Sequence, residues 1–272
     1  MNPPVLPMLA ERVDELPAEG KWIFEPKWDG FRALVFRDGD ELEMQSRDEK
    51  PLNRYFPEIV EALKSQLPPR AVLDGEIVLA RGSVLDFEAL QLRLHPAASR
   101  VKTLAKQTPA SIVFFDLLAG GERDLRNEPF EMRRTMLEGI LRNAAPPVYI
   151  TPATQERATA LDWFRRFEGA GLDGVMAKPA SGSYQPDKRV MLKVKHEREC
   201  DCVVAGFRWY KGAEGKRLGR CCLGFMTKRA GCSTWVCARV SQRRREGNCC
   251  TFWRHIARTH WTITRGRSGL AI

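Results

Sequence analysis

The sequence predicts an α+β fold with antiparallel sheets for residues 1–219. Short apolar or alternating runs predict strands, and apolar residues spaced three and four apart predict helices between them. Several connections are too short for a parallel crossover, which favours antiparallel pairing. The turn at residues 37–39 directly follows an apolar run, and it predicts a hairpin.

Strands and helices are expected to alternate along this part of the chain. The first helix is indicated by one apolar face, formed by Ile59, Val60, Leu63 and Leu67. The expected strands lie at residues 22–24, 31–37, 41–46, 71–79, 112–117, 174–178, 190–195 and 202–209, and the helices at 55–67, 130–141 and 158–170.

The composition changes abruptly near Gly219. The chain has 44 basic and 34 acidic residues, but residues 220–272 contain eleven of the basic residues and a single acid, Glu246. Residues 1–219 are therefore electrically balanced. Six of the eight cysteines lie at or after Cys221, whereas all 17 prolines precede residue 220. Three independent changes at one place predict a boundary there.

The start of the chain carries no sign of targeting. Residues 1–17 contain early prolines but no basic leader and no long apolar run, so neither a signal peptide nor a membrane span is expected. A cytoplasmic protein is therefore expected. A length of 272 residues most naturally divides into two domains.

A lysine stands in the segment EPKWDGFR, between two predicted strands, where an unpaired ammonium group is costly to bury. Lys27, Asp29, Gly30 and Arg32 form the pattern KxDGxR. A lysine becomes a nucleophile when desolvation or neighbouring cations lower its pKa. Taken alone, the pattern favours an ordinary surface lysine in a turn, so the interpretation depends on the rest of the chain.

Further motifs follow in order along the chain. They are SRD at 46–48, DGE at 74–76, FFD at 114–116, DGVMAK at 173–178 and KVK at 193–195. This series resembles the covalent nucleotidyltransferase superfamily of ATP-dependent DNA ligases, RNA ligases and mRNA capping enzymes. The EPKWDG form, the PPVLPMLA opening and the segment DCVVAGFRWYKG are most similar to bacterial ATP-dependent DNA ligases of the end-joining and repair type.

The resemblance implies a fold for each part of the chain. Residues 1–199 are expected to form the adenylation (nucleotidyltransferase) domain, with ATP-grasp-like antiparallel sheets and helices. Residues 200–272 are expected to begin an OB-fold β-barrel. Only the 53 residues 220–272 remain after Gly219, about half of what such a barrel needs for five strands, so an incomplete OB-fold is predicted.

The resemblance also implies a reaction. Lys27 would attack the α-phosphate of ATP and carry AMP as a lysyl-AMP intermediate. The AMP would pass to the 5′-phosphate of a nick in double-stranded DNA, and the 3′-hydroxyl would displace it. The implied nucleotide contacts are Glu25 with the adenine amino group, Phe115 stacked on adenine, Arg32 and Arg47 on sugar and phosphate oxygens, and Lys178, Lys193 and Lys195 on the α-phosphate.

Two acids and the expected partners complete this hypothesis. Glu76 and Asp173 are implied ligands of Mg²⁺, for which Mn²⁺ is expected to substitute. The acid at position 173 is commonly glutamate in the family, so the shorter Asp173 leaves direct and water-mediated contact both open. Expected partners are nicked or broken DNA and end-joining or repair proteins. The protein is expected to be a monomer associated with the nucleoid.

The C-terminal residues leave several hypotheses open. They could be a cationic DNA-binding extension, or a zinc site formed by Cys232, Cys237, His255 and His260. The favoured hypothesis is translation in the wrong frame, since a one-nucleotide shift permits an apolar strand, a polar turn and a second strand. A defective barrel predicts an impaired ligase. The alternatives are a non-ligating nucleotide- or nucleic-acid-binding remnant, and an RNA ligase or capping-type enzyme.

Overall fold

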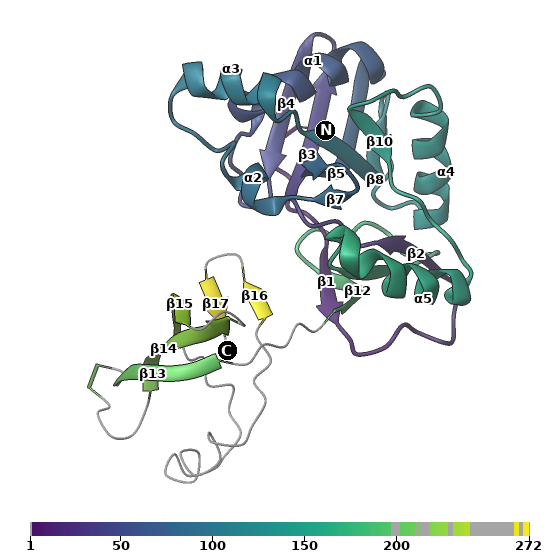
Figure 1. Cartoon of the computed structure of the whole chain (residues 1–272). Coiled ribbons are helices and arrows are strands. Elements are labelled where there is room, and N and C mark those ends of the chain that lie inside the picture. Colours follow the sequence, from purple (N-terminus) through teal and green to yellow (C-terminus); the bar gives the residue numbers. More distant parts are fainter. Residues whose placement is uncertain are drawn as a thin grey trace. The chain divides into compact units, whose positions relative to one another are not determined.

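The computed structural model describes residues 2–196, 202–209, 211–212, 218–227, 231–239, 264–266 and 269–271. The chain divides into two compact units, Met1–His196 and Glu197–Ile272, which are coloured from purple to teal-green and from green to yellow in Figure 1. The predicted domain boundary at residues 199 and 200 falls within 197–201, outside the described residues.

The larger sheet of the first unit has six strands in the order β10-β8-β5-β3-β4, with β9 paired to β8. Neighbouring strands run antiparallel except for β10 and β8, which are parallel. The strands are β3 (Phe31–Asp38), β4 (Glu41–Ser46), β5 (Arg70–Val78), β8 (Ser111–Gly120), β9 (Arg123–Asp124) and β10 (Val148–Ile150).

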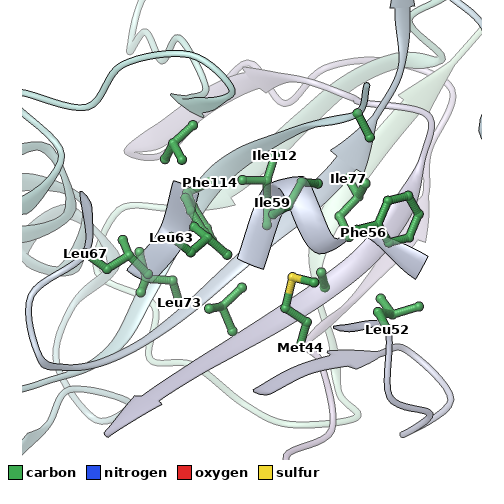
Figure 2. Packing of buried hydrophobic residues seen from close by; sticks show 14 of the residues in the cluster. Met44, Leu52, Phe56, Ile59, Leu63, Leu67, Leu73, Ile77, Ile112 and Phe114 are labelled. Atoms are coloured by element: carbon green, nitrogen blue, oxygen red, sulfur yellow. The ribbon is translucent and has the colours of Figure 1, made fainter. Parts of the chain in front are cut away.

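Helix α1 (Pro57–Gln66) covers one face of this sheet. It begins with proline, whose fixed φ and missing N–H suit the first helical position. Its buried residues Ile59 and Leu63 pack among strand residues such as Ile112 and Phe114, as Figure 2 shows. Burial of these apolar side chains is the main stabilising contribution on this face.

The N-terminal segment packs against the opposite face of the same sheet. Val5, Met8 and Ala10 are buried in a cluster that includes Leu34 and Phe36 of β3. The alternation along β3 explains this division, because neighbouring residues of a strand point to opposite faces. The sheet is therefore covered on both sides.

A second sheet of the first unit has four strands in the order β1-β12-β11-β2. Strand β1 pairs with β12 in parallel, and the other pairs are antiparallel. Helix α5 (Arg157–Arg166) packs on this sheet through Ala160, which is buried beside Phe24 and Val175. The strands are β1 (Leu9–Arg12), β2 (Trp22–Pro26), β11 (Gly174–Pro179) and β12 (Arg189–Lys195).

Most remaining elements of this unit are short, but helix α4 packs against β8 and contributes Leu137 to the core. Helix α2 is capped by Asp86, whose carboxylate accepts a hydrogen bond from the Ala89 N–H at 2.8 Å. These elements are the 3₁₀ helices η1 (Asn53–Tyr55) and η2 (Phe167–Ala170), the helices α2 (Phe87–Gln91), α3 (Ala98–Gln107) and α4 (Phe130–Ile140), and the paired strands β6 (Ala80–Arg81) and β7 (Val84–Leu85).

The described segments of the second unit form a five-stranded sheet in the order β13-β14-β15-β17-β16. Its strands are β13 (Cys202–Trp209), β14 (Leu218–Thr227), β15 (Gly231–Arg239), β16 (Thr264–Gly266) and β17 (Gly269–Ala271). The incomplete barrel stays a prediction. Of the four proposed zinc ligands, His255 and His260 lie outside the described residues. None of the described helices has the length and apolar character needed to cross a membrane.

The α+β prediction is confirmed for the first unit, and each expected strand and helix there has an observed counterpart. The expectation of purely antiparallel sheets is wrong. Two parallel pairs, β1 with β12 and β10 with β8, occur at sheet edges. Their connections are long rather than short, since residues 13–188 separate β1 from β12, so no tight crossover is required.

Candidate active site

Lys27 lies in the turn directly after β2 and is fixed through its backbone. Its N–H donates to the Gly174 carbonyl at 2.8 Å, and its carbonyl accepts from the Asp173 N–H at 3.0 Å. Gly174 has a φ of +138°, and a Cβ there would fall 2.0 Å from the Val194 carbonyl oxygen. Only glycine fits this position, so the Asp-Gly pair holds Lys27 close to Asp173.

The ammonium group of Lys27 is paired with a carboxylate. Its Nζ lies 2.8 Å from Asp173 Oδ2, and the Nζ of Lys195 lies 2.5 Å from the same oxygen. Burial alone would raise the pKa of Asp173, but the two lysines outweigh it and lower that pKa. Asp173 is therefore an ionised bridge between the candidate nucleophile and a second cation.

Lys193 adds a third cation two residues before Lys195 on β12, where alternate residues share a face. Its ammonium donates to the Ala10 carbonyl at 3.2 Å. Burial lowers the pKa of Lys193 to about 8, helped by the charges of Lys195, Lys27, Arg189 and Arg47. We call Lys27, Asp173, Lys193 and Lys195 the phosphate end of the site.

Arg47 is an exposed residue in the turn after β4. Its charge contributes to the lowered pKa of Lys193, so it lies within electrostatic reach of the phosphate end. Its predicted contact with sugar or phosphate stays a prediction.

Glu25 lies two residues before Lys27 and is almost fully buried. Its Oε2 lies 2.7 Å from Lys178 Nζ, and its Oε1 lies 3.1 Å from Arg134 Nη1. Burial raises the pKa of Glu25, against the opposing effect of Lys178 and Arg134. Lys178 was predicted at the α-phosphate, but here it groups with Glu25 and also donates to the Phe115 carbonyl at 3.2 Å.

The two neighbouring phenylalanines of β8 face opposite sides of the sheet. Phe114 is fully buried in the core beneath α1. The Phe115 ring faces the site, with Lys178 Nζ 4.5 Å and Arg32 Cζ 4.7 Å from its centre. Both contacts have cation–π geometry. A base that stacks on Phe115 must share its ring with these cations or displace them. We call Glu25, Lys178, Arg134 and Phe115 the base end of the site.

Arg32 is held by a buried carboxylate instead of pointing freely into the site. Its Nε and Nη2 each lie 2.5 Å from an oxygen of Asp74, a forked arrangement that fixes the guanidinium plane. The Tyr184 hydroxyl donates to Asp74 Oδ2 at 2.7 Å and accepts from the Met8 N–H at 3.1 Å. Burial and, after it, the Asp74 carboxylate raise the pKa of Tyr184 well above its usual range.

Three residues at the site were missed from the sequence: Arg134, Asp74 and Tyr184. Asp74 lies inside the DGE motif but was assigned no role. Arg134 lies on the buried side of α4. Two adjacent arginines within an apolar helical pattern could have indicated a buried arginine there. Tyr184 carried no comparable signal in its turn-rich surroundings.

The two predicted metal ligands, Glu76 and Asp173, carry the carboxylate oxygens that Mg²⁺ prefers. Glu76 is buried opposite Arg32 in the β3–β5 ladder, and Asp173 already accepts from two lysines. The described residues contain no group of three or more potential metal ligands. Mg²⁺ needs only one or two protein carboxylates when water and substrate phosphates complete its shell. The donor set therefore suits a substrate-shared ion and not a closed protein cage.

Two sheets that meet at a lysine turn, with carboxylates and cations around it, define a nucleotidyltransferase-type domain. The family model of the ATP-dependent DNA ligase domain matches residues 7–195. The chain therefore belongs to the ATP-dependent DNA ligase family, and this membership implies ATP use. It favours the DNA-ligase hypothesis over an RNA ligase or a capping-type enzyme.

Similar proteins agree with this assignment. DNA ligase C2 of Mycolicibacterium smegmatis is 59% identical over 209 residues, or 77% of this chain and 58% of that protein. DNA ligase C of Mycobacterium tuberculosis is 55% identical over 213 residues, or 77% and 59%. The structure of mycobacterial DNA ligase D complexed with ATP and MES has a TM-score of 0.56 at 28% identity, covering 81% of this chain and 67% of that one. The chain thus spans less than two thirds of the length of both DNA ligase C relatives.

Proposed function

We propose that this chain joins nicks in double-stranded DNA, using ATP and a covalent lysyl-AMP intermediate on Lys27. The observation that carries the proposal is the pairing of Lys27 with Asp173, 2.8 Å apart, within the residues that match the ligase family. A lysine at a glycine-dependent turn beside an ionised acid and two further lysines is unusual for a purely structural role.

The first step would form a P–N bond and break a P–O bond. The Lys27 amine attacks the α-phosphorus of ATP, and pyrophosphate leaves with the bonding electron pair. The amine that attacks carries no extra proton, and the lowered pKa of Asp173 makes that carboxylate a poor acceptor for it. Asp173 instead orients the amine, and it must release the ammonium group before attack.

The next steps would transfer AMP to the 5′-phosphate at the nick and then release it when the 3′-hydroxyl attacks. Phosphoryl transfer depends on positioning and on neutralisation of charge. Lys193 and Lys195 supply positive charge on one face of β12. Glu76 and Asp173 would hold Mg²⁺, which neutralises phosphate charge when bound. We also propose nicked or broken DNA as the substrate, end-joining or repair proteins as partners, and a monomeric state.

We further propose that nick sealing is impaired in this chain. The support is the abrupt change in charge, cysteine and proline content after Gly219. Sequencing the gene across the Gly219 codon tests the wrong-frame hypothesis directly. An intact reading frame there would contradict it and would favour a genuine basic extension.

The experiment that tests the function is labelling with α-labelled ATP and Mg²⁺, with wild type and Lys27→Ala compared after denaturing electrophoresis. We expect covalent label on the wild type alone, because Lys27 is the proposed nucleophile. Addition of nicked DNA should move some of the label into DNA–adenylate and sealed product. Label that persists on Lys27→Ala would overturn the assignment. Label that never moves to DNA would favour the non-ligating remnant.

A further inference from the structure

A single buried carboxylate at the base end is held between two cations from different elements. Glu25 on β2 contacts Lys178 on β11 and Arg134 on α4, one cation at each oxygen. The side chains of Glu25, Lys178 and Arg134 are 2%, 3% and 8% exposed. Ionised oxygens offer about four acceptor positions in total, so two remain for a ligand after these contacts.

Arg134 is itself fixed by further hydrogen bonds. Its Nη2 donates to the Thr151 carbonyl at 2.6 Å, and its Nε donates to Glu138 at 2.7 Å. The Thr151 hydroxyl in turn accepts from the indole N–H of Trp28, the residue after Lys27, at 2.8 Å. Arg134 is therefore built into the wall of the site, where it acts on Glu25 and does not reach out to a phosphate.

The charge state of Glu25 determines which hydrogen bonds it can make. An ionised carboxylate only accepts, whereas a protonated one can also donate. Burial favours the protonated form, Lys178 and Arg134 oppose it, and Asp116 favours it weakly. Asp116 is paired with Arg133 at 2.8 and 2.9 Å. Removal of Arg134 would leave Lys178 as the one cation in contact with Glu25 among the described residues.

Adenine and guanine differ at the position that Glu25 is proposed to contact. Adenine presents an amino group, which donates, and guanine presents a carbonyl oxygen, which accepts. An obligate acceptor pairs with the first and repels the second. We propose that Arg134 is a positioning residue that, together with Lys178, makes the site select an adenine over a guanine nucleotide by holding Glu25 as an acceptor. This inference rests on the proposed function and on the contact of Glu25 with the adenine amino group that the family resemblance implies.

The test compares labelling by α-labelled ATP and α-labelled GTP in wild type, Arg134→Met and Arg134→Lys between about pH 6 and pH 8. We expect the GTP-to-ATP labelling ratio to rise about tenfold in Arg134→Met. This is about the effect of losing one hydrogen bond between the adenine amino group and a charged acceptor. The ratio should rise further as the pH falls, because Glu25 then gains its proton. It should stay near the wild-type value in Arg134→Lys, which keeps the cation.

Two further variants separate this role from general loosening of the fold. Arg142→Met removes an exposed arginine just after α4 and should leave the ratio unchanged. Glu25→Gln can donate as well as accept, so it should raise the ratio by itself, and adding Arg134→Met to it should change the ratio no further. If Arg134→Met fails to fold in a thermal unfolding assay, Glu25→Gln and Arg134→Lys still decide the question.

An unchanged, pH-independent ratio in folded Arg134→Met, or in Glu25→Gln, would overturn the inference. A wild type that takes no label from either nucleotide would overturn the proposed function instead. In that case equilibrium binding of ATP and GTP to the same variants measures the ratio of the two affinities, which does not depend on catalysis. Equal wild-type affinities for the two nucleotides would then overturn the inference as well.

Discussion

The base end and the phosphate end of the site are built alike but behave differently. Each centres on one carboxylate that bridges two cations, Glu25 at the base end and Asp173 at the phosphate end. The Glu25 side chain is 2% exposed and its pKa is raised, whereas Asp173 is 28% exposed and its pKa is lowered. Burial outweighs the cations at one end, and the cations outweigh burial at the other.

This difference matches what each end is proposed to do. Ion pairs with little solvent contact are costly to break, because a lone buried charge remains. Partly exposed pairs exchange partners more cheaply, since water replaces the lost contact. The base end is therefore suited to fixed recognition. The phosphate end is suited to releasing Lys27 when phosphates and a metal ion arrive.

The variant with the largest expected effect on stability is Glu25→Ala. It leaves the buried Lys178 without its acid and leaves Arg134 with Glu138 alone, which should cost about 3–5 kcal/mol of unfolding free energy. Urea unfolding of the full chain, followed by circular dichroism, measures the shift in midpoint. A loss of unfolding free energy similar to that of Asp173→Ala would show that the difference in burial does not make the two ends differ in stability.

A smaller effect is expected for Tyr184→Phe, which removes one hydroxyl and keeps the ring. Asp74 loses a charged hydrogen bond and the Met8 N–H loses its acceptor, so the cost should be about 2 kcal/mol. Arg32 should become less well fixed, and the ATP concentration for half-maximal labelling should rise. Tyr149→Phe, at an exposed tyrosine, is the matched control and should change neither quantity.

Asp173→Ala should cost at most about 1 kcal/mol of unfolding free energy, because its pairs with Lys27 and Lys195 are partly exposed. Its effect on labelling should be far greater than its effect on stability, since the nucleophile loses its orienting partner. The same urea titration and the α-labelled ATP assay measure both. Near-normal labelling would contradict the orienting role of Asp173.

The smallest effect is a pH dependence at Lys193. Its pKa is lowered to about 8, from an ordinary value of 10.5, so the unfolded chain binds more protons between these limits. The folded state should therefore gain stability from Lys193 as the pH rises through that window. Relative to Lys193→Met, we expect a gain of a few tenths of a kcal/mol, because the charge is only half-buried. Urea unfolding at several pH values measures the difference in unfolding free energy between wild type and Lys193→Met. A difference that does not change with pH would contradict this expectation.

The sequence predicted the longer strands of the first unit, because their periodicity is local, and it missed the short strands β1, β6, β7, β9 and β10. Strand β4 is observed at the bounds expected from its alternating pattern, Glu41–Ser46. Helix α3 was missed, since Ala98–Gln107 has few apolar residues and mixes Ser, Thr, Lys and Arg. Val101 and Leu104 nevertheless have the three-residue spacing of one helical face, and both are buried.

The site residues that lie in sequence motifs were predictable. The residues that reach the site only through tertiary packing were not. Lys27, Asp173 and Lys195 come together as the order of motifs indicated. The Arg134–Glu25 contact joins residues 109 positions apart, and the Tyr184–Asp74 contact joins residues 110 apart. Such pairs depend on how α4 and the loop before β12 pack, which no local pattern of one sequence specifies.

The parallel pairing of β1 with β12 has a consequence for biosynthesis. Leu9 to Arg12 are translated before residues 13–188, and their partners, Arg189 to Lys193, emerge only after that stretch. Synthesis at about 5–20 residues per second leaves this edge of the four-stranded sheet unpaired for about ten seconds or more. During that interval the strand edge is open to wrong pairing. Lys193 and Lys195 belong to β12, the last strand of this sheet to be translated. The phosphate end is therefore complete only after β12 has paired with β1 and β11.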